Sequence, residues 1–186
     1  DEDRIDLQGA RSTPHFKPDF NLDLMRSMPY VGGLLVLRRA LFVELGGFDA
    51  RWDGAEEFDL ALRLAERVGE TGFGHVADVL YHRLASSGRS RRPPEAICAD
   101  LPKIVQGHLD RSRVAAVAEP GNPPHTCRVQ YRHDGPEPLV SIVIPTKNQL
   151  DLLKRCVETV LRLTAYQSYE IIIVDTGSTD STIEIA

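Results

Sequence analysis

The sequence predicts a mixed α/β fold with parallel strands, and three consecutive stretches between residues 138 and 175 carry this prediction. The first, PLVSIVIPT, is a continuous apolar run rich in β-branched residues, typical of a strand buried on both faces. The second, QLDLLKRCVETVLRLTAY, repeats apolar residues at the spacing of one helix face. The third, YEIIIVD, is another apolar strand. Strand, helix and strand in this order predict a βαβ unit with a right-handed crossover.

The helix of this unit has a definite predicted face and start. Its apolar side holds Leu153, Cys156, Val157, Val160, Leu161 and Thr164. Asn148 stands where a helix-capping side chain is expected. Ligands of parallel sheets gather at the carboxyl ends of the strands. The candidate binding residues there are Pro145, Thr146, Asp175 and Gly177.

Residues 1–83 are less regular but still predict alternating elements. A strand is expected at 33–37, and a short helix at 38–45 ends at a Gly-Gly pair. The segment AEEFDLALRLAERVG predicts an amphipathic helix with Phe58, Ala61, Leu62, Ala65 and Val68 on one face. A further strand is expected around 75–82.

Residues 84–137 predict a connecting region. Its basic run SGRSRRPP, at 87–94, favours a solvated linker over an anion or membrane contact. A helix should begin at Pro94 or Glu95, with a kink near Pro102. The alternating segment TCRVQYRH predicts a strand, and proline- and glycine-rich stretches flank it.

Composition narrows the class of protein. Apolar residues make up 42% and charged residues 26% of the 186 residues, which is typical of a soluble globular protein. The net charge of −5 gives no electrostatic reason to expect nucleic acid as a partner. Three widely spaced cysteines favour neither a disulfide framework nor a cysteine zinc site, so a reducing cytosol is expected. No apolar run approaches the ~20 residues of a membrane span. The abrupt ends and missing initial methionine predict a piece of a longer protein.

Acidic residues supply the first candidates for chemistry. Asp1 and Asp3, one residue apart, could present two carboxylates to a hard cation such as Mg²⁺ or Mn²⁺. An acidic cluster of this kind can equally be solvated. Glu56 and Glu57 begin the predicted amphipathic helix, where anions are favoured electrostatically. A carboxylate there could also be a general base.

Three further residues have weaker claims. Asp59 is either part of the same acidic site or structural. His82 ends a predicted strand, and a neutral imidazole could complete a site built from aspartates. The DTGS sequence that begins at Asp175 also occurs in aspartic proteases, but those need two such aspartates sharing a proton. The single copy here follows a βαβ pattern, which argues against a protease.

Taken in order, these motifs resemble family 2 glycosyltransferases, which have the GT-A fold. PLVSIVIPTKN, LLKRCVETVL and YEIIIVDTGSTDST resemble the amino-terminal half of such a domain. DEDRID, GGLLVLRRALFVELGGFD, GAEEFDLALRLAE and VLYHR resemble the carboxyl-terminal half, beginning at the metal-binding D-x-D motif. The resemblance is strongest to bacterial tandem-domain enzymes of the O-antigen or rhamnosyltransferase type.

This resemblance implies a division of the chain into three parts. Residues 1–83 would be the second half of one GT-A domain, 84–137 a connector, and 138–186 the first half of the next domain. Either the two halves belong to separate incomplete domains, or they pack as a circularly permuted version of one domain, which we favour. The implied fold is a Rossmann-like, mostly parallel sheet with flanking helices.

The resemblance also implies roles for residues. Pro145, Thr146 and Asp175 would bind the nucleoside part of a nucleoside-diphosphate sugar. Asp1 and Asp3 would hold Mg²⁺ or Mn²⁺ on the diphosphate, with His82 assisting. Glu57 would deprotonate the acceptor hydroxyl for an inverting transfer.

The implied setting is bacterial surface polysaccharide synthesis. The acceptor would be a saccharide or a lipid-linked saccharide. The expected location is the cytoplasm, with peripheral association at the inner face of the membrane. The family usually has Asp at the position of Glu57, which leaves open a role for Glu56, an inactive fragment, or a non-catalytic nucleotide-sugar-binding module.

Overall fold

The structure is a computed structural model that describes residues 1–84, 94–133 and 135–182. These residues form two compact units, Asp1–Arg132 and His133–Ala186. The predicted basic linker at 87–94 lies almost entirely outside the described residues. None of the described helices combines the length and apolar character needed to cross a bilayer.

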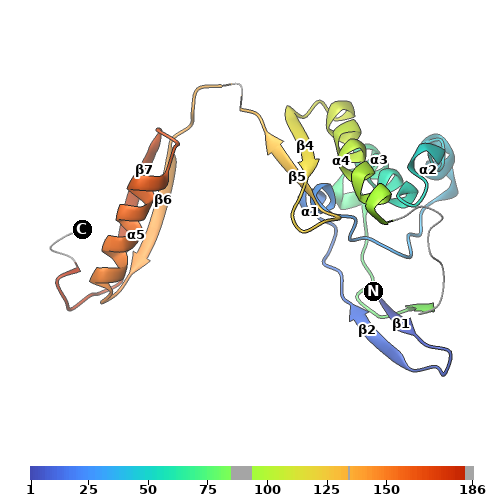
Figure 1. Cartoon of the computed structure of the whole chain (residues 1–186), viewed down its shortest axis with the longest axis horizontal. Helices are drawn as coiled ribbons and strands as arrows, with labels where there is room; N and C mark the ends of the chain where they lie inside the picture. Colours follow the sequence, from blue (N-terminus) through green and yellow to red (C-terminus); the bar gives the residue numbers. More distant parts are fainter. Residues whose placement is uncertain (85–93, 134, 183–186) are drawn as a thin grey trace. The chain divides into compact units, whose positions relative to one another are not determined.

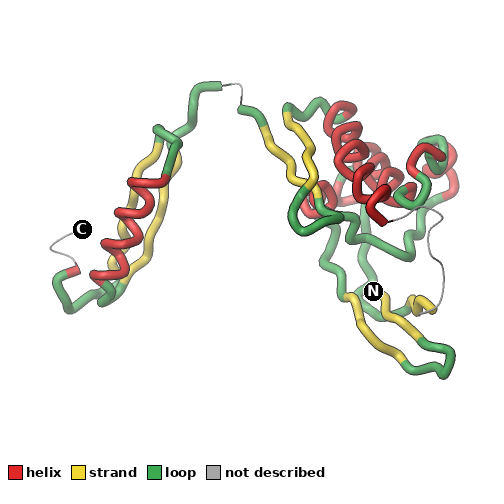
Figure 2. Tube along the Cα trace, in the orientation of Figure 1, coloured by secondary structure: helices red, strands yellow, loops and turns green. Residues whose placement is uncertain are grey.

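The described residues of the first unit form two small sheets and four α-helices. Figures 1 and 2 show how these elements are arranged. In order, its elements are β1 (Glu2–Ile5), β2 (Arg11–His15), α1 (Leu22–Ser27), α2 (Arg39–Glu44), η1 (Ala50–Trp52), α3 (Glu56–Val68), η2 (Glu70–Gly72), β3 (Tyr81–Leu84), α4 (Pro94–Arg111), β4 (Ala116–Pro120) and β5 (Cys127–Tyr131). Strand β1 pairs antiparallel with β2 and parallel with β3. Strands β4 and β5 form an antiparallel hairpin.

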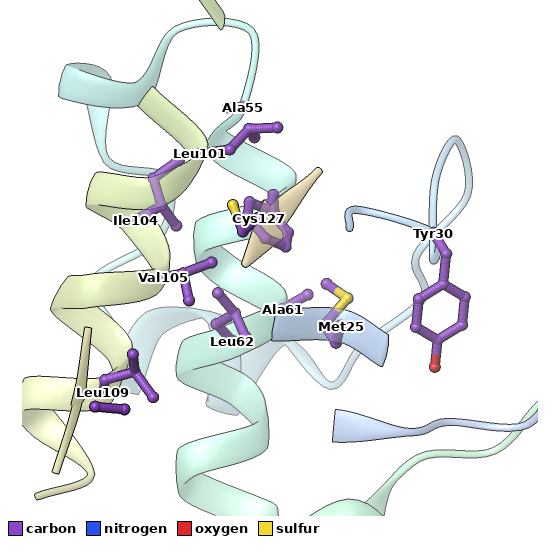
Figure 3. Close-up of a cluster of buried hydrophobic side chains, with 12 residues drawn as sticks. Met25, Tyr30, Ala55, Ala61, Leu62, Leu101, Ile104, Val105, Leu109 and Cys127 are labelled. Atoms are coloured by element: carbon purple, nitrogen blue, oxygen red, sulfur yellow. The ribbon is translucent and has the colours of Figure 1, made fainter. Parts of the chain in front are cut away.

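The core of the first unit lies between α3, α4, α1 and the hairpin (Figure 3). Helix α3 forms as its apolar spacing predicts, and Phe58, Ala61 and Leu62 are buried along its inner face. Helix α4 contributes Leu101, Ile104, Val105 and Leu109, and runs unbroken through Pro102. The segment predicted as a connector therefore packs against the helix that carries Glu57.

The second unit is the predicted βαβ unit, made of β6 (Val140–Thr146), α5 (Leu150–Leu163) and β7 (Tyr169–Asp175). Strands β6 and β7 are parallel, in a register that places Thr146 opposite Asp175. The pairing confirms the predicted unit. Figure 1 shows α5 lying along the strand pair.

Several local predictions are wrong. No strand forms at 33–37, and the strand expected around 75–82 forms instead at Tyr81–Leu84, overlapping only the end of that range. Helix α5 begins after Gln149 with no side-chain cap, because the Asn148 side chain bonds to Thr179 instead. Strands β6 and β7 were expected to be buried on both faces.

One face of the β6–β7 pair is in fact open in the second unit. Val143, Ile172 and Val174 are each more than 40% exposed, since one helix can cover only one face of two strands. The mixed α/β class is confirmed. The described strands lie in three separate sheets, of which two contain parallel pairs, and not in one mostly parallel sheet.

Candidate functional site

The carboxyl ends of β6 and β7 form a hydrogen-bonded edge in the second unit. Thr176 donates both its backbone N–H and its Oγ1 to the carbonyl of Thr146, each at 3.0 Å. The two strand ends that carry the predicted residues Pro145, Thr146 and Asp175 are therefore joined directly. Parallel pairing explains this, because it brings both carboxyl ends to one edge of the sheet.

The Asp175 carboxylate is held by its own loop. The backbone N–H groups of Gly177 and Ser178 each donate to Oδ2 at 3.0 Å, and the Ser178 hydroxyl donates to Oδ1. Gly177 has φ of 93°, a left-handed conformation that glycine adopts without strain. The bonds from Ser178 and Gly177, with help from the charge of Lys147, hold the pKa of Asp175 below its usual value of 3.8.

Asn148 connects the loop after β6 to the loop after β7. Its backbone N–H donates to Ser178 Oγ at 2.9 Å, and its side-chain Oδ1 accepts from the backbone N–H of Thr179 at 2.7 Å. The two loops thus form one preorganised edge around Asp175.

In the first unit, the structure brings together Asp3 and His82, as the predicted site requires. They are direct neighbours on the parallel strands β1 and β3, and His82 Nδ1 lies 2.6 Å from Asp3 Oδ1. The other oxygen, Oδ2, accepts from Arg11 Nε at 2.5 Å. Burial raises the pKa of Asp3, but the bonds from His82 and Arg11 outweigh it and hold the pKa below 3.8.

Asp1 is held by a histidine that the sequence analysis missed. Oδ1 of Asp1 lies 2.9 Å from His75 Nε2 and accepts from the Lys17 backbone N–H at 2.9 Å. The other ring nitrogen of His75 lies 3.2 Å from Asp19 Oδ1. His75 begins the strand expected around 75–82, but that pattern gives no reason to place its ring beside Asp1.

These contacts leave Asp1 and Asp3 poorly suited to a cation as they stand. Arg11 and His82 engage both oxygens of Asp3, and His75 and Lys17 engage one oxygen of Asp1. Among the described ranges, no group of three or more His, Cys, Asp or Glu side chains could hold a metal ion. The residues do not fit Mg²⁺ or Mn²⁺ in this arrangement, and the cation stays a prediction.

Glu57 lines a different cavity, of about 370 Å³. It shares this cavity with Tyr81 and Arg83, which flank His82 on β3. Side chains alternate between the two faces of a strand, so Tyr81 and Arg83 lie on the face opposite His82. Asp1 instead lines a larger cavity of about 670 Å³, in which Glu57 takes no part. The structure therefore does not bring Asp1 and Glu57 to one cavity.

Comparison with known proteins identifies relatives for both units. Residues 141–186 match the family model described as Glycosyl transferase family 2. Over 184 residues, 96% of this chain, the sequence is 39% identical to the O-antigen biosynthesis protein RfbC of Myxococcus xanthus. Over 97% of this chain it is 37% identical to the protein y4gI of Sinorhizobium fredii.

These two relatives are much longer than the present chain, which spans 14% and 20% of their respective lengths. A shorter match covers 25% of this chain, at 51% identity, with the glycosyltransferase GlyG of Streptococcus pneumoniae, and 15% of that protein. No solved structure matches.

Proposed function

Residues 141–186 belong to a glycosyl transferase family 2 domain, and from this we propose that the chain is part of an enzyme that transfers a sugar from a nucleoside-diphosphate sugar to a hydroxyl acceptor. The pairing of Thr146 with Asp175 at the carboxyl edge of parallel strands carries the proposal. Parallel α/β sheets bind nucleotides at this edge. The similarity to an O-antigen biosynthesis protein supports a role in bacterial surface polysaccharide synthesis.

The second unit is proposed to bind the nucleoside. Pro145, Thr146 and Asp175 would line the base and ribose. Asp175 is an ionised acceptor at neutral pH, as an ordinary aspartate would be, and its lowered pKa keeps it ionised further into the acid range. An ionised carboxylate can accept hydrogen bonds from the N–H of a base or from ribose hydroxyls. Its fixed loop would reduce the entropy lost when the nucleotide binds.

Glu57 is proposed as the general base of the first unit. It would take the proton of the acceptor hydroxyl as that oxygen bonds to the anomeric carbon from the face opposite the diphosphate. The bond to the diphosphate breaks and the anomeric carbon is inverted. The family usually has Asp at this position. The side chain of Glu57 is longer by one methylene, which shifts the point at which the carboxylate can take the proton. Because the described residues gather no cation site, no step is assigned to a cation.

A second candidate is a non-catalytic nucleotide-sugar-binding module. The observation in its favour is that Arg11, His75 and His82 occupy the carboxylates of Asp1 and Asp3. A module of this kind would bind nucleotide at the second unit without turnover.

Binding of UDP, dTDP, GDP and CDP, followed by isothermal calorimetry, tests the proposal. At least one should bind, and Asp175→Ala should weaken binding by roughly tenfold or more, the effect of losing a hydrogen bond to a charged group. Asp151→Ala, in the first turn of α5, is the matched control and should leave binding unchanged. Absence of binding by all four nucleotides would contradict a nucleotide site in this chain.

Turnover separates the two candidates. Hydrolysis of a nucleotide sugar that is lost in Glu57→Ala supports the enzyme. Nucleotide binding with no turnover, even in the longer protein, supports the module.

A further inference from the structure

The hairpin of the first unit contributes a residue to the cavity of Glu57. This cavity, of about 370 Å³, is lined by Glu57, by Tyr81 and Arg83 of β3, and by His125 of the turn between β4 and β5. We propose that it is an acceptor subsite for an uncharged pyranose, with His125 as a specificity-determining residue. The inference rests on the proposed function. It adds that the region predicted as a connector, residues 84–137, contributes a residue to the acceptor site.

The chemistry of the lining suits a sugar ring. An aromatic side chain such as Tyr81 offers an apolar face to the C–H groups of a pyranose and carries a polar hydroxyl. The Arg83 guanidinium only donates hydrogen bonds, and the carboxyl oxygens of Glu57 can accept them. A neutral imidazole donates through one ring nitrogen and accepts through the other. Sugar hydroxyls both donate and accept. The cavity volume lies within the range of small-molecule sites.

The charges favour a neutral ligand over an anion. The acidic Glu57 and the basic Arg83 line the same cavity, and Arg83 also lies near Glu2, with Nη1 3.7 Å from Oε1. A phosphate or carboxylate ligand would have to overcome the repulsion of Glu57 with one guanidinium that is already partly neutralised. A polyhydroxyl ligand meets no such cost.

Tyr81 is held in place by a close approach to the chain at Gly33. A Cβ atom at Gly33 would lie 2.7 Å from Tyr81 Cε1 and 2.7 Å from Glu2 Oε2, closer than real Cβ contacts allow. Glycine at this position therefore lets the ring lie against the backbone. A ring fixed in this way costs less conformational entropy when it binds a sugar.

The turn that carries His125 is also fixed. The Gly121 N–H donates to the Thr126 carbonyl at 2.9 Å, and Thr126 Oγ1 donates to the Pro123 carbonyl at 2.6 Å. Cys127, two residues after His125, is 5% exposed in the core. The turn therefore cannot move freely relative to α3 and α4, whose side chains form that core.

His125 has an unusual backbone conformation within this turn. Its φ is 63°, in the left-handed region that only a few per cent of non-glycine residues occupy. The strain is sustained by the surrounding turn, and strained residues of this kind gather at ligand sites. In the described part of the chain, its imidazole makes no hydrogen bond, so both ring nitrogens are open to a ligand.

Saturation-transfer NMR of the whole chain with methyl glycosides of glucose, galactose and mannose tests the inference. His125→Gly removes the imidazole and suits the left-handed backbone, so it should fold as well as the original. His125→Asn tolerates the same backbone and keeps a donor and an acceptor. His15→Ala, on the exposed strand β2, is the matched control.

We expect at least one glycoside to bind, and His125→Gly to weaken its binding roughly three- to tenfold, the value of one hydrogen bond. His125→Asn should retain part of the affinity, and His15→Ala all of it. Glu57→Gln should also weaken binding. Thermal melting of each variant checks that the fold is retained.

The other outcomes overturn the inference and are distinguishable from failure of the proposed function. If Glu57→Gln weakens glycoside binding but His125→Gly does not, the role of His125 is refuted and the acceptor site of the proposed function stands. If no glycoside binds while a nucleoside diphosphate still does, the subsite is refuted and the nucleotide site stands. If neither ligand binds, both proposals fail.

Discussion

Nδ1 of the buried His108 in α4 lies 2.7 Å from Oε1 of Glu66 in α3, so one imidazole joins the two central helices of the first unit. On its other side, His108 Nε2 accepts from Arg26 Nε of α1 at 3.2 Å. An arginine nitrogen can only donate, so Nε2 must be the acceptor and Nδ1 the donor to Glu66. Both ring nitrogens of His108 are therefore bonded, Nε2 as acceptor and Nδ1 as donor.

Replacing His108 by leucine should destabilise the first unit. The change keeps the volume roughly constant but leaves Arg26 and Glu66 each without one partner, which costs about 1–3 kcal/mol. Trp52, the only tryptophan of the chain, lies in this unit, so its fluorescence in urea reports the unfolding directly. The exposed control His15→Leu should change the free energy of unfolding by less than about 0.5 kcal/mol. Equal stability of the two variants would contradict the assigned role of His108.

Acid should weaken the first unit through Glu66 and Asp3. Burial raises the pKa of Glu66, but bonds from His108 and Arg111 bring it below 4.5, and the pKa of Asp3 is also lowered. Groups with lowered folded pKa values contribute stability above their unfolded values, and this contribution is lost as pH falls through the folded values. These two groups should therefore leave the urea concentration at the midpoint of unfolding unchanged between pH 7 and 5. Below pH 5 their protonation should lower that midpoint, down to pH 3. Glu66→Gln should flatten that fall, whereas Glu95→Gln, exposed in α4, should not.

The sequence identifies those parts of the fold that depend on local patterns. Helix α3 forms within its predicted segment, because its apolar residues recur at helical spacing and Gly69, with φ of 69°, follows its last residue. The βαβ unit is predictable for the same reason. Strand β2, all of it exposed, has no apolar alternation and was missed. The apolar segment 33–37 was predicted as a strand but has no strand partner in the described residues.

The residues of the candidate sites also divide into those that local sequence patterns can place and those that they cannot. Thr146 and Asp175 could be placed together from sequence, because both end adjacent parallel strands. His75 and His125 could not, since each comes near its site through a loop whose path depends on tertiary contacts. Once the strand β3 is known, the positions of Tyr81 and Arg83 can be predicted too. Side chains alternate along a strand, so both lie on the face opposite His82.

Arg63 should be essential for the stability of α3. Its Nε donates at 2.8 Å to Oδ2 of Asp59, which is buried, and its Nη1 and Nη2 donate to the carbonyls of Leu45 and Gly47. The structure thus gives Asp59 a structural role, one of the two predicted. Arg63→Met leaves a buried carboxylate without its partner and should cost about 3–5 kcal/mol in urea unfolding followed by Trp52.

A matched control for Arg63 lies on the same helix. Arg67 pairs with Glu44 at the surface, where both side chains are about half exposed. Arg67→Met should therefore cost only about 0–1 kcal/mol. If the two arginine variants lose the same stability, the buried pair with Asp59 has no special role.

Removing Arg11 should improve cation binding at Asp3. Arg11 occupies Oδ2 of Asp3, and a cation must displace it to bind that oxygen. Arg11→Ala should therefore raise the affinity for Mn²⁺ roughly two- to fivefold, the value of an ion pair with one exposed partner. Free Mn²⁺ measured by electron paramagnetic resonance gives the affinity without any need for turnover.

Two variants control the Mn²⁺ experiment. Arg4→Ala removes an exposed arginine next to Asp3 and should leave the affinity unchanged. Asp3→Asn should cancel the gain in affinity that Arg11→Ala brings. Mn²⁺ affinity that is insensitive to Asp3→Asn would remove Asp3 from the predicted ligands.

The three cysteines should react with iodoacetamide at very different rates. Cys127 is buried in the core beside α3 and α4, and burial raises the pKa of its thiol to about 11 from 9.0. The two-unit difference makes its thiolate roughly 100-fold scarcer than that of an ordinary cysteine at pH 8, and the thiolate is the reactive form. Cys156 is exposed on α5 and should be alkylated first, followed by the half-buried Cys98.

Mass spectrometry of tryptic peptides gives the order in which the three cysteines are alkylated. In urea, Cys127 should react as fast as the others, because unfolding removes the burial that protects it, and early labelling of Cys127 in the native protein would place the hairpin outside the core.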